Sequence, residues 1–247
     1  MIKLSKSPNI PETLQSASVV QEKQRISNII ASGANPSSKD FKSELYGATD
    51  VRTQLLSDQH NKCVFCECTL LSQDGGEVEH YRPKTAYRQD SSPRNTQKPA
   101  YHNLAYDWHN LSVCCHACNR RKSTFFPLRD NAFRFNLQVE EPLILNPYII
   151  DPIHHVEFRR AKLFARVDEH NNVDEKGRNT ITLIGLNRKD LLELRKRKYN
   201  KFIREMNRQG ISFDEKLQQD IHDEFSEGRT EENIEFLGMF KNQKYKF

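Results

Sequence analysis

Two pairs of cysteines with the spacing Cys-x-x-Cys constrain the fold of this chain more than any other feature. The first pair is Cys63 and Cys66, and the second is Cys115 and Cys118. Two residues between thiols let both sulfurs reach one ion from a tight turn, and two such pairs complete a tetrahedral four-thiolate site. We therefore predict a structural zinc ion that ties two distant segments of the chain together.

The two remaining cysteines, Cys68 and Cys114, are interpreted as bystanders. Cys114 adjoins Cys115, and one helical register cannot direct both thiols to the same ion. Exchange of either bystander into the site is the main alternative for the ligand set, and buried free thiols are the alternative without a metal. Two Cys-x-x-Cys pairs rarely arise by chance, so the zinc site is the preferred interpretation.

The interpretation of the cysteines depends on the compartment. The first residues lack the apolar stretch of a secretory signal, and no apolar run approaches the roughly 20 residues that a bilayer-spanning helix needs. We therefore expect a cytoplasmic protein without a membrane partner, in which thiols stay reduced. Hydrophobic residues make up 36% of the chain and include 14 Phe, which is enough to build a core.

The net charge of +5 is unevenly distributed. Residues 80–134 contain ten Lys and Arg against three acids, a net charge of +7 around the predicted metal site. A polyanion is the simplest partner for such a surface. Residues 188–208 are also basic, with nine bases against three acids, but there we favour an ordinary solvated helix face.

The periodicity of apolar residues and the positions of turn and cap residues predict an α+β fold with helical N- and C-terminal extensions. Before the first cysteine pair, we expect helices over 12–31 and 50–60. Short strands at 77–80 and 111–113 and a short helix near Cys115 follow. Later segments predict a hairpin within 156–177 and a helix over 188–208 that Asn187 and Asp190 cap. We divide the chain into a helical segment 1–60, a zinc-stapled core 61–135, and a C-terminal region 136–247.

Three groups of apolar residues complete this prediction. The helix over 12–31 is expected to bury Val19, Val20, Ile26, Ile29 and Ile30. The helix over 188–208 is expected to bury Leu191, Leu194, Phe202, Ile203 and Met206. Tyr106 and Trp108 are expected to pack a long loop onto the fold. The apolar segment 236–240 fits either internal packing or the docking of a partner.

A fixed order of polar residues accompanies the cysteine pairs. The order is C-x2-C, E-H-x2-P, N-L-x3-C-x2-C-N-x2-K, and its polar members are Glu79, His80, Asn110, Asn119 and Lys122. Over residues 63–122 it resembles the HNH nuclease family, also called ββα-metal or His-Me finger nucleases. The resemblance implies a ββα-metal core with the acid–histidine pair on the first strand, Asn-Leu on the second, and His or Asn on the helix.

The resemblance also implies roles for single residues. His80 would be the catalytic base, and Asn110 would hold its imidazole in the productive orientation. This chain has Glu79 where many members have Asp, and Asn119 where many have His. Asn is a weaker ligand, so we expect a modest affinity for the catalytic metal. A lone acid–histidine pair is usually a surface feature, but the joint order favours an enzyme. His116, between two zinc cysteines, is interpreted as lining the loop.

The chemistry of these side chains agrees with hydrolysis of a phosphodiester. The ordinary pKa of histidine suits His80 for taking a proton from water near neutral pH. Glu79 and the amide oxygen of Asn119 are hard donors suited to Mg²⁺ or Mn²⁺. Adjacent strand residues point to opposite faces, so Glu79 and His80 can share one site only where the strand ends or bends.

Basic side chains next to the motif are predicted to bind backbone phosphates, which gives affinity without sequence preference. They are Arg82, Lys84, Arg121 and Lys122. The leading hypothesis is a metal-dependent endonuclease acting on DNA. One alternative is an RNase of the same fold that cleaves tRNA or phage RNA. Another is a zinc module that binds nucleic acid without catalysis. The sequence does not determine the oligomeric state.

Beyond the motif, the whole chain is similar to the HNH nuclease subunit of Septu-type and retron-associated anti-phage systems. The segments that carry this similarity are EVEHYRPK, LAYDWHNLSVCCHACNRRKSTFFPL and LILNPYIIDP. The resemblance implies a partner ATPase of the ABC/SMC-like kind that controls the nuclease. The helical flanks, 1–60 and 180–247, would then be its docking surfaces.

Overall fold

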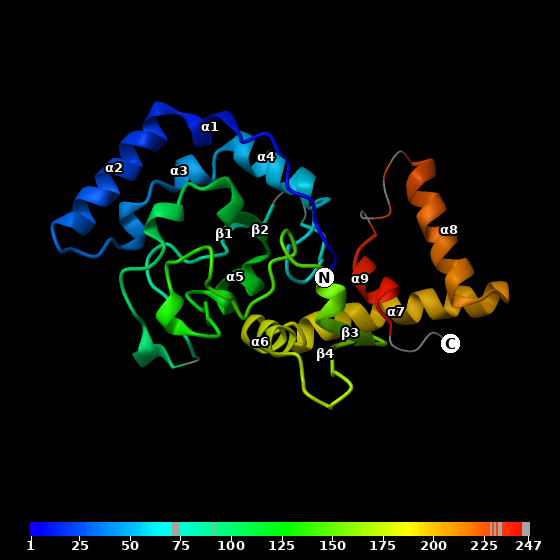
Figure 1. Ribbon diagram of the computed structural model, residues 1–247. Helices are drawn as coiled ribbons and strands as arrows, with labels where there is room; N and C mark the ends of the chain where they lie inside the picture. The colour runs from blue at the N-terminus through cyan, green and yellow to red at the C-terminus, as the bar shows by residue number, and fades with distance from the viewer. Residues whose placement is uncertain (71–74, 91, 228, 230, 232–233, 244–247) are drawn as a thin grey trace.

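A computed structural model describes residues 1–70, 75–90, 92–227, 229, 231 and 234–243. Its helices and strands mix in the manner of an α+β protein (Figure 1). The α-helices are α1 (Glu12–Gln15), α2 (Ala17–Ala31), α3 (Ser43–Tyr46), α4 (Thr49–Asp58), α5 (His116–Lys122), α6 (Glu175–Ile184), α7 (Lys189–Gln209), α8 (Phe213–Ser226) and α9 (Leu237–Lys241). The strands are β1 (Glu77–His80), β2 (Leu111–Cys114), β3 (Val156–Arg159) and β4 (Lys162–Ala165). Among the described helices, none is both long and apolar enough to cross a membrane.

The centre of the molecule is a pair of antiparallel strands followed by a helix. Strand β1 pairs with β2 so that Glu79 lies opposite Ser112 and His80 opposite Leu111. Helix α5 begins directly after β2 and packs against β1. The predicted strands and the short helix are confirmed within a residue or two. Between the strands, residues 81–110 form a long loop with three short 3-10 helices, which are Pro93–Asn95, His102–Leu104 and Trp108–Asn110.

The two faces of this strand pair have different partners. Val78, Leu111 and Val113 pack against the N-terminal helices in a core that also contains Trp108. Because side chains alternate along a strand, His80 points to this face as well, while Glu79 points towards α5. Figure 1 shows helices α1–α4 arching over this side of the strands. The buried Trp108, together with Tyr106, confirms that these rings pack the long loop onto the fold.

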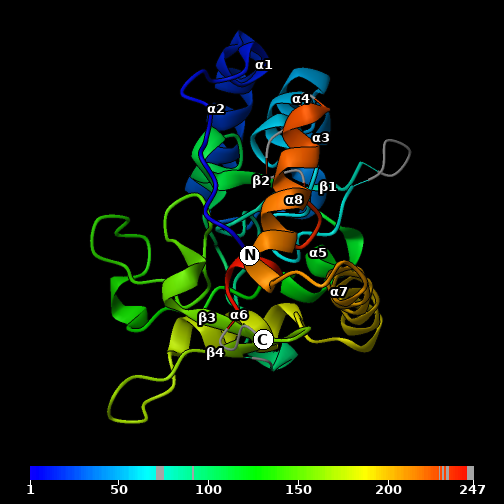
Figure 2. The same ribbon diagram turned by 90° about the vertical axis from the view of Figure 1, so that its right-hand side faces the viewer.

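A larger core joins the cysteine segments to the C-terminal half. It includes Cys63, Cys118, Leu186, Phe202 and Phe240, so it crosses the boundaries that we drew at residues 60 and 135. The hairpin β3–β4, helix α6 and helix α7 form the base of this half, and α8 rises from the far end of α7 (Figures 1 and 2). The segment 236–240 is buried in this core, so it is an internal packing segment.

Several local predictions need correction. The first helix is broken, because Ser16 caps a new helix, and Val20 is 64% exposed. Leu194 is exposed on α7 as well. The cap of α7 is the backbone of Arg188, and the Asn187 side chain instead binds the backbone of Leu163 in β4. Residues 175–177, which we assigned to the end of a hairpin, are the first turn of helix α6.

Candidate metal centre and acid–histidine site

The four cysteines of the two Cys-x-x-Cys pairs meet at one point. The Sγ atoms of Cys63, Cys66, Cys115 and Cys118 all lie within 4.8 Å of one another. The Cys66 and Cys115 sulfurs are 3.8 Å apart, which matches the edge of a tetrahedron with Zn–S bonds of about 2.3 Å. The cluster can therefore hold a metal such as zinc. It includes neither Cys68 nor Cys114.

Local structure explains why these thiols converge. The first pair lies in a tight turn after α4, where the Cys63 N–H donates to the Cys68 carbonyl and the Glu67 N–H donates to the Cys63 carbonyl. The second pair spans the start of α5, with Cys115 as its N-cap and Cys118 in its first turn. The Val64 N–H donates to the Val113 carbonyl of β2, which fixes one turn against the other.

An arginine from the C-terminal half contacts the cluster. Arg188 places Nη1 3.5 Å from Cys118 Sγ and Nη2 3.8 Å from Cys115 Sγ. A zinc ion bound by four thiolates carries a net negative charge, and a guanidinium at this position partly neutralises it. Arg195, further along α7, is also buried. The interpretation of residues 188–208 as an ordinary solvated face is therefore wrong for Arg188 and Arg195.

Glu79 is buried at the end of β1 with a charged partner. Its Oε1 lies 2.5 Å from Nζ of Lys122, a residue of α5 that is itself fully buried. The Lys122 ammonium therefore satisfies this oxygen as a close ion pair. Burial raises the pKa of Glu79, and the Lys122 ammonium opposes that rise. A buried carboxylate with a raised pKa and a single charged partner is a candidate for a functional position.

His80 is held as a neutral imidazole with a defined tautomer. Its Nε2 lies 2.9 Å from the Ala105 carbonyl oxygen, which can only accept, so Nε2 carries the proton. Nδ1 is then the acceptor, and Lys84 Nζ lies 3.3 Å away from it. The ring of Tyr46 packs edge-on against the imidazole. Burial lowers the pKa of His80, and Lys84 lowers it further.

Lys84 connects His80 to Glu79 although these two side chains leave opposite faces of the strand. Burial lowers the pKa of Lys84 to about 8, and the negative charge of Glu79 opposes that shift. Lys122 makes a second connection, since its ammonium donates to the His80 carbonyl at 2.8 Å. Glu79, His80, Lys84 and Lys122 therefore form one buried charged cluster at the end of β1.

Asn110 braces the backbone around His80. Its Oδ1 accepts from the Arg82 N–H at 2.8 Å, and its Nδ2 donates to the carbonyls of Arg82 and Leu104. Leu104 precedes Ala105, the residue whose carbonyl contacts the imidazole. The contact of Asn110 with the histidine therefore runs through the backbone, whereas the sequence suggested that it holds the ring itself.

Asn119 lies on the same side of the strands as Glu79 but has a different partner. Its Nδ2 donates to Oε2 of Glu77, two residues before Glu79 on β1. The other oxygen of Glu77 lies 2.7 Å from Nδ1 of His116. The sequence analysis did not consider Glu77. Its position two residues before Glu79 was the available signal, because residues i and i+2 of a strand share a face.

The predicted phosphate-binding residues differ in accessibility. The Arg82 guanidinium pairs with buried Glu140, with Nε 2.5 Å from Oε1. Lys122 is fully buried against Glu79, so it lacks the free ammonium at the surface that we predicted. Lys84 is half-buried beside His80, and Arg121 is exposed on α5. Of these four, Arg121 and Lys84 retain the position that a phosphate contact requires.

The residues around Glu79 fit a hard divalent cation. The carboxylates of Glu79 and Glu77 and the amide of Asn119 are oxygen-bearing groups on one side of β1 and α5. Such groups suit Mg²⁺ or Mn²⁺ better than zinc. Lys122 supplies the positive charge next to Glu79 in this structure, so an ion bound there would compete with an ammonium.

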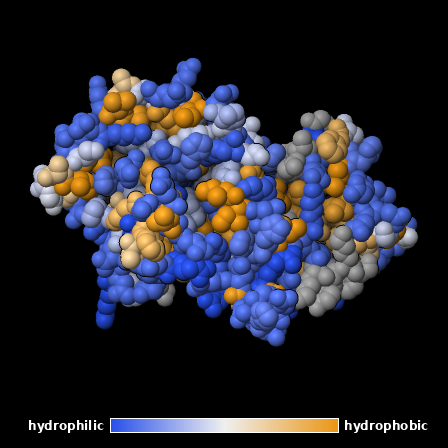
Figure 3. Space-filling model, in the orientation of Figure 1, coloured by the Kyte–Doolittle hydropathy of each residue, from blue (hydrophilic) through white to orange (hydrophobic). Residues whose placement is uncertain are grey.

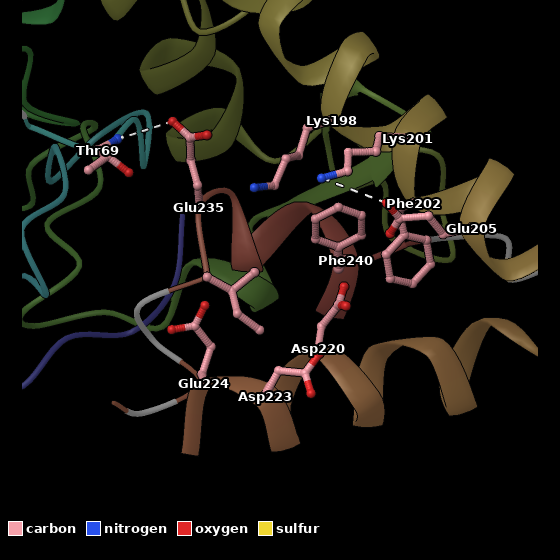
Figure 4. A pocket seen from close by; sticks show the side chains of 11 residues that line it. Thr69, Lys198, Lys201, Phe202, Glu205, Asp220, Asp223, Glu224, Glu235 and Phe240 are labelled. Atoms are coloured by element: carbon pink, nitrogen blue, oxygen red, sulfur yellow. Dashed lines mark hydrogen bonds and ion pairs between the residues drawn. The ribbon is translucent and has the colours of Figure 1, made fainter. Parts of the chain in front are cut away.

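A separate pocket lies between α7 and α8, away from these residues (Figure 4). The ammonium groups of Lys198 and Lys201 project into it from α7, and Asp220, Asp223 and Glu224 face them from α8. Phe202 and Phe240 form its apolar floor. None of the predicted catalytic or zinc residues lines this pocket.

The described residues thus form an α+β protein with a four-cysteine centre that can bind a metal such as zinc. No protein-family model matches the sequence. The chain is similar to the Septu protein PtuB of Bacillus mycoides (strain KBAB4), with 32% identity over 160 residues, which cover 63% of this chain and 52% of that protein. It is 28% identical to the Septu protein PtuB of Bacillus thuringiensis over 188 residues, which cover 76% and 55%. The chain is thus similar to these PtuB proteins, and it spans about half of their length.

Proposed function

We propose that the chain is a metal-dependent HNH endonuclease that hydrolyses DNA as the effector of an anti-phage defence system. The order strand–strand–helix around Glu79, His80, Asn110 and Asn119 supports an HNH core. The similarity to proteins named Septu PtuB supports a role in defence. The observation that carries the proposal is the buried Glu79 carboxylate, paired with Lys122, next to a neutral, oriented His80 at the end of β1.

His80 performs the proton transfer in this proposal. The Ala105 carbonyl holds the proton on Nε2, so the lone pair of Nδ1 is free to accept a proton from the attacking water. Asn110 keeps the 104–105 backbone in place through Leu104. Lys84 adjoins Nδ1 and must yield that position to water, which leaves its ammonium next to the developing negative charge on the phosphate.

Glu79 and Asn119 would hold the catalytic Mg²⁺ or Mn²⁺. When bound, such an ion polarises the phosphate and stabilises the departing 3′ oxygen. Release of Asn119 from Glu77 would bring its amide oxygen to the same ion. The exposed Arg121, together with Lys84, would bind neighbouring phosphates of the substrate backbone.

A partner ATPase of the ABC/SMC-like kind would control this activity by binding the helical flanks. The pocket between α7 and α8 lies on one of those flanks, and none of the predicted catalytic residues lines it (Figure 4). The four-cysteine zinc site has a structural role, because all four of its coordination positions are occupied by thiolates.

The substitution His80→Ala tests the proposal. We expect nicking of plasmid DNA in the presence of Mg²⁺ or Mn²⁺ to fall by about 100-fold or more, because general-base catalysis is lost. The matched control is His154→Ala, since His154 is an exposed histidine far from β1. Zinc content and the circular dichroism spectrum should match those of the wild type in both variants. Undiminished nicking by His80→Ala would contradict the assignment.

Parallel assays separate this proposal from its two alternatives. Matched DNA and RNA substrates distinguish a DNase from an RNase, which would use the same residues. A zinc module without catalysis would bind nucleic acid and leave both substrates intact. In that case the double variant Glu79→Gln/His80→Ala would protect cells from phage as well as the wild type does.

A further inference from the structure

The loop over residues 130–140 reverses the usual distribution of polar and apolar side chains. Two of its three charged residues, Arg134 and Glu140, are buried, each 8% exposed, and only Asp130 at its start is exposed. Its four large apolar residues are about half exposed, namely Phe133 (50%), Phe135 (48%), Leu137 (46%) and Val139 (53%). In Figure 3, hydrophobic side chains gather where this loop lies in Figure 1. Contiguous apolar surface on a polar protein usually marks a binding site.

The two buried charges fix the loop in place. Arg134 donates to the Tyr101 hydroxyl, to Gln89 and to the Phe126 carbonyl. Glu140 accepts from the Tyr101 hydroxyl at 2.7 Å and from the Phe135 N–H at 3.2 Å. These hydrogen bonds fix the backbone of the loop from its buried side. The apolar side chains therefore point outward from an ordered loop.

The exposed rings continue into a group of aromatic side chains that pack against two guanidiniums, of which that of Arg88 is partly exposed and that of Arg134 is buried. The guanidinium of Arg88 lies 3.9 Å from the ring centre of Phe125, and that of Arg134 lies 3.8 Å from that of Tyr87. Tyr87 in turn packs edge-on against Phe135, with ring centres 6.0 Å apart. We call the set Tyr87, Arg88, Phe125, Phe133 and Phe135 the arginine–aromatic surface.

This surface adjoins the proposed active site. Phe125 lies just after α5, where its N–H donates to the Lys122 carbonyl. On the other side, Glu140 links the loop to Arg82, two residues after His80. A nucleic-acid strand that is bound with one phosphate at His80 would therefore reach these rings with its next nucleotides.

We propose that the arginine–aromatic surface stacks on unpaired bases of the nucleic-acid substrate. This inference rests on the proposed nuclease function and adds a preference for single-stranded or locally opened substrates. Rings interleaved with guanidinium groups bind bases irrespective of sequence, because every base has a π-face. The exposed bases of the same segment, which include Arg94, Lys98, Arg120 and Arg121, favour a polyanion over an apolar protein partner. Paired bases cannot make this contact, since their faces are already stacked in the duplex.

Substitutions at Phe133 test the inference in a His80→Ala background, in which binding is measured without cleavage. The probes are fluorescent oligo-dT and oligo-U strands and a duplex, each of about 16 nucleotides, measured by anisotropy at one fixed salt concentration. We expect Phe133→Leu to weaken single-strand binding roughly fivefold or more, because a stacking ring is lost, and to leave duplex binding unchanged. Phe133→Tyr retains a ring and should bind as the parent does. Phe225→Leu, which alters a similarly exposed ring on α8, is the matched control.

The outcomes separate this inference from the proposed function. Equal single-strand affinity of Phe133→Leu and its parent overturns the stacking inference, whatever the wild type cleaves. Loss of self-association or of a protein partner in Phe133→Leu, with unchanged nucleic-acid affinity, also overturns it. If the wild type binds single strands through Phe133 but cleaves nothing, the nuclease proposal fails and the stacking surface remains.

Discussion

Arg188 shows how a single side chain far along the sequence completes a site. The four cysteines alone present four thiols, and the guanidinium of Arg188, the N-cap residue of α7, supplies the opposite charge. The Cys-x-x-Cys spacing predicted the ligands, because two thiols separated by two residues act locally. It could not predict Arg188. That contact depends on how α7 packs against the cysteine segments, and 73 positions separate Arg188 from Cys115.

The substitution Arg188→Ala should weaken zinc binding. Residues around the ligands of a metal typically contribute about 10- to 100-fold in affinity, and here a positive charge next to a negative centre is removed. Competition with a chromophoric chelator measures the change. Arg197→Ala is the control, since it removes an exposed arginine from the same helix. Equal zinc affinity in both variants would show that the guanidinium contact has no effect on the metal.

The same limit applies to the acid–histidine residues. The motif correctly placed Glu79 and His80 at the end of a strand next to a helix. It did not predict that Lys122 turns inward to Glu79, or that Asn119 binds Glu77. Both contacts depend on the rotation of α5 about its axis. A helix of seven residues has too little periodicity to define that rotation from sequence.

At the scale of elements, the N-terminal segment before α1 acts as a strap across the long loop. The Leu4 N–H donates to the Pro147 carbonyl at 3.0 Å, and the Trp108 indole N–H donates to the Ser7 carbonyl at 3.0 Å. The ammonium of Lys6 lies 4.0 Å from the centre of the Trp108 ring and 4.5 Å from that of Tyr148. The sequence did not indicate these contacts, because one lysine between two distant rings leaves no local pattern.

The strap gives the protein a specific pH dependence. Burial lowers the pKa of Lys6 to about 7, against the partial opposition of Asp58 and Asp107. The unfolded chain has the ordinary lysine pKa of about 10.4, so it binds more protons than the folded state between about pH 7 and 10, and stability rises with pH there. In Lys6→Met, the gain in melting temperature between about pH 7 and pH 9 should shrink. Lys23→Met removes an exposed lysine and should keep the wild-type gain.

Element boundaries were predictable where a cap or a glycine marks them. Gly210 ends α7 in the left-handed conformation, as the sequence indicated. Helix α6 was missed because residues 175–184 begin with polar residues and a glycine that resemble a turn. Its glycine is required by packing, since a Cβ at Gly177 would lie 2.2 Å from the His155 carbonyl oxygen.

For the whole molecule, the metal centre lies where the two halves of the chain meet. Cys63, Cys66 and Cys118 share a core with Leu186 and Leu191 from the C-terminal half. The division at residues 60 and 135 was drawn from composition, which reports local character and not the packing of distant segments. The division of the chain at residues 60 and 135 therefore remains a prediction.

Removal of zinc should therefore loosen the C-terminal half as well as the cysteine segments. We expect chelation to increase hydrogen exchange in α5, α6 and the first turns of α7, because their shared core loses its central anchor. Helix α2 packs in the other core and should change little. Mass-spectrometric exchange at peptide resolution measures both regions in one sample, and an increase confined to residues 63–68 and 115–118 would contradict the prediction.

The turn that carries Cys63 and Cys66 also contacts a residue that is synthesised much later. The Gly238 N–H donates to Oε2 of Glu67 at 2.9 Å, although 171 positions separate them. A ribosome releases the chain from its N-terminus, so all four thiols emerge well before Arg188 and Gly238 exist to cover them. During much of translation the four thiols are therefore reactive and not yet covered by Arg188 and Gly238. Zinc supply during that interval would determine how many newly made molecules fold.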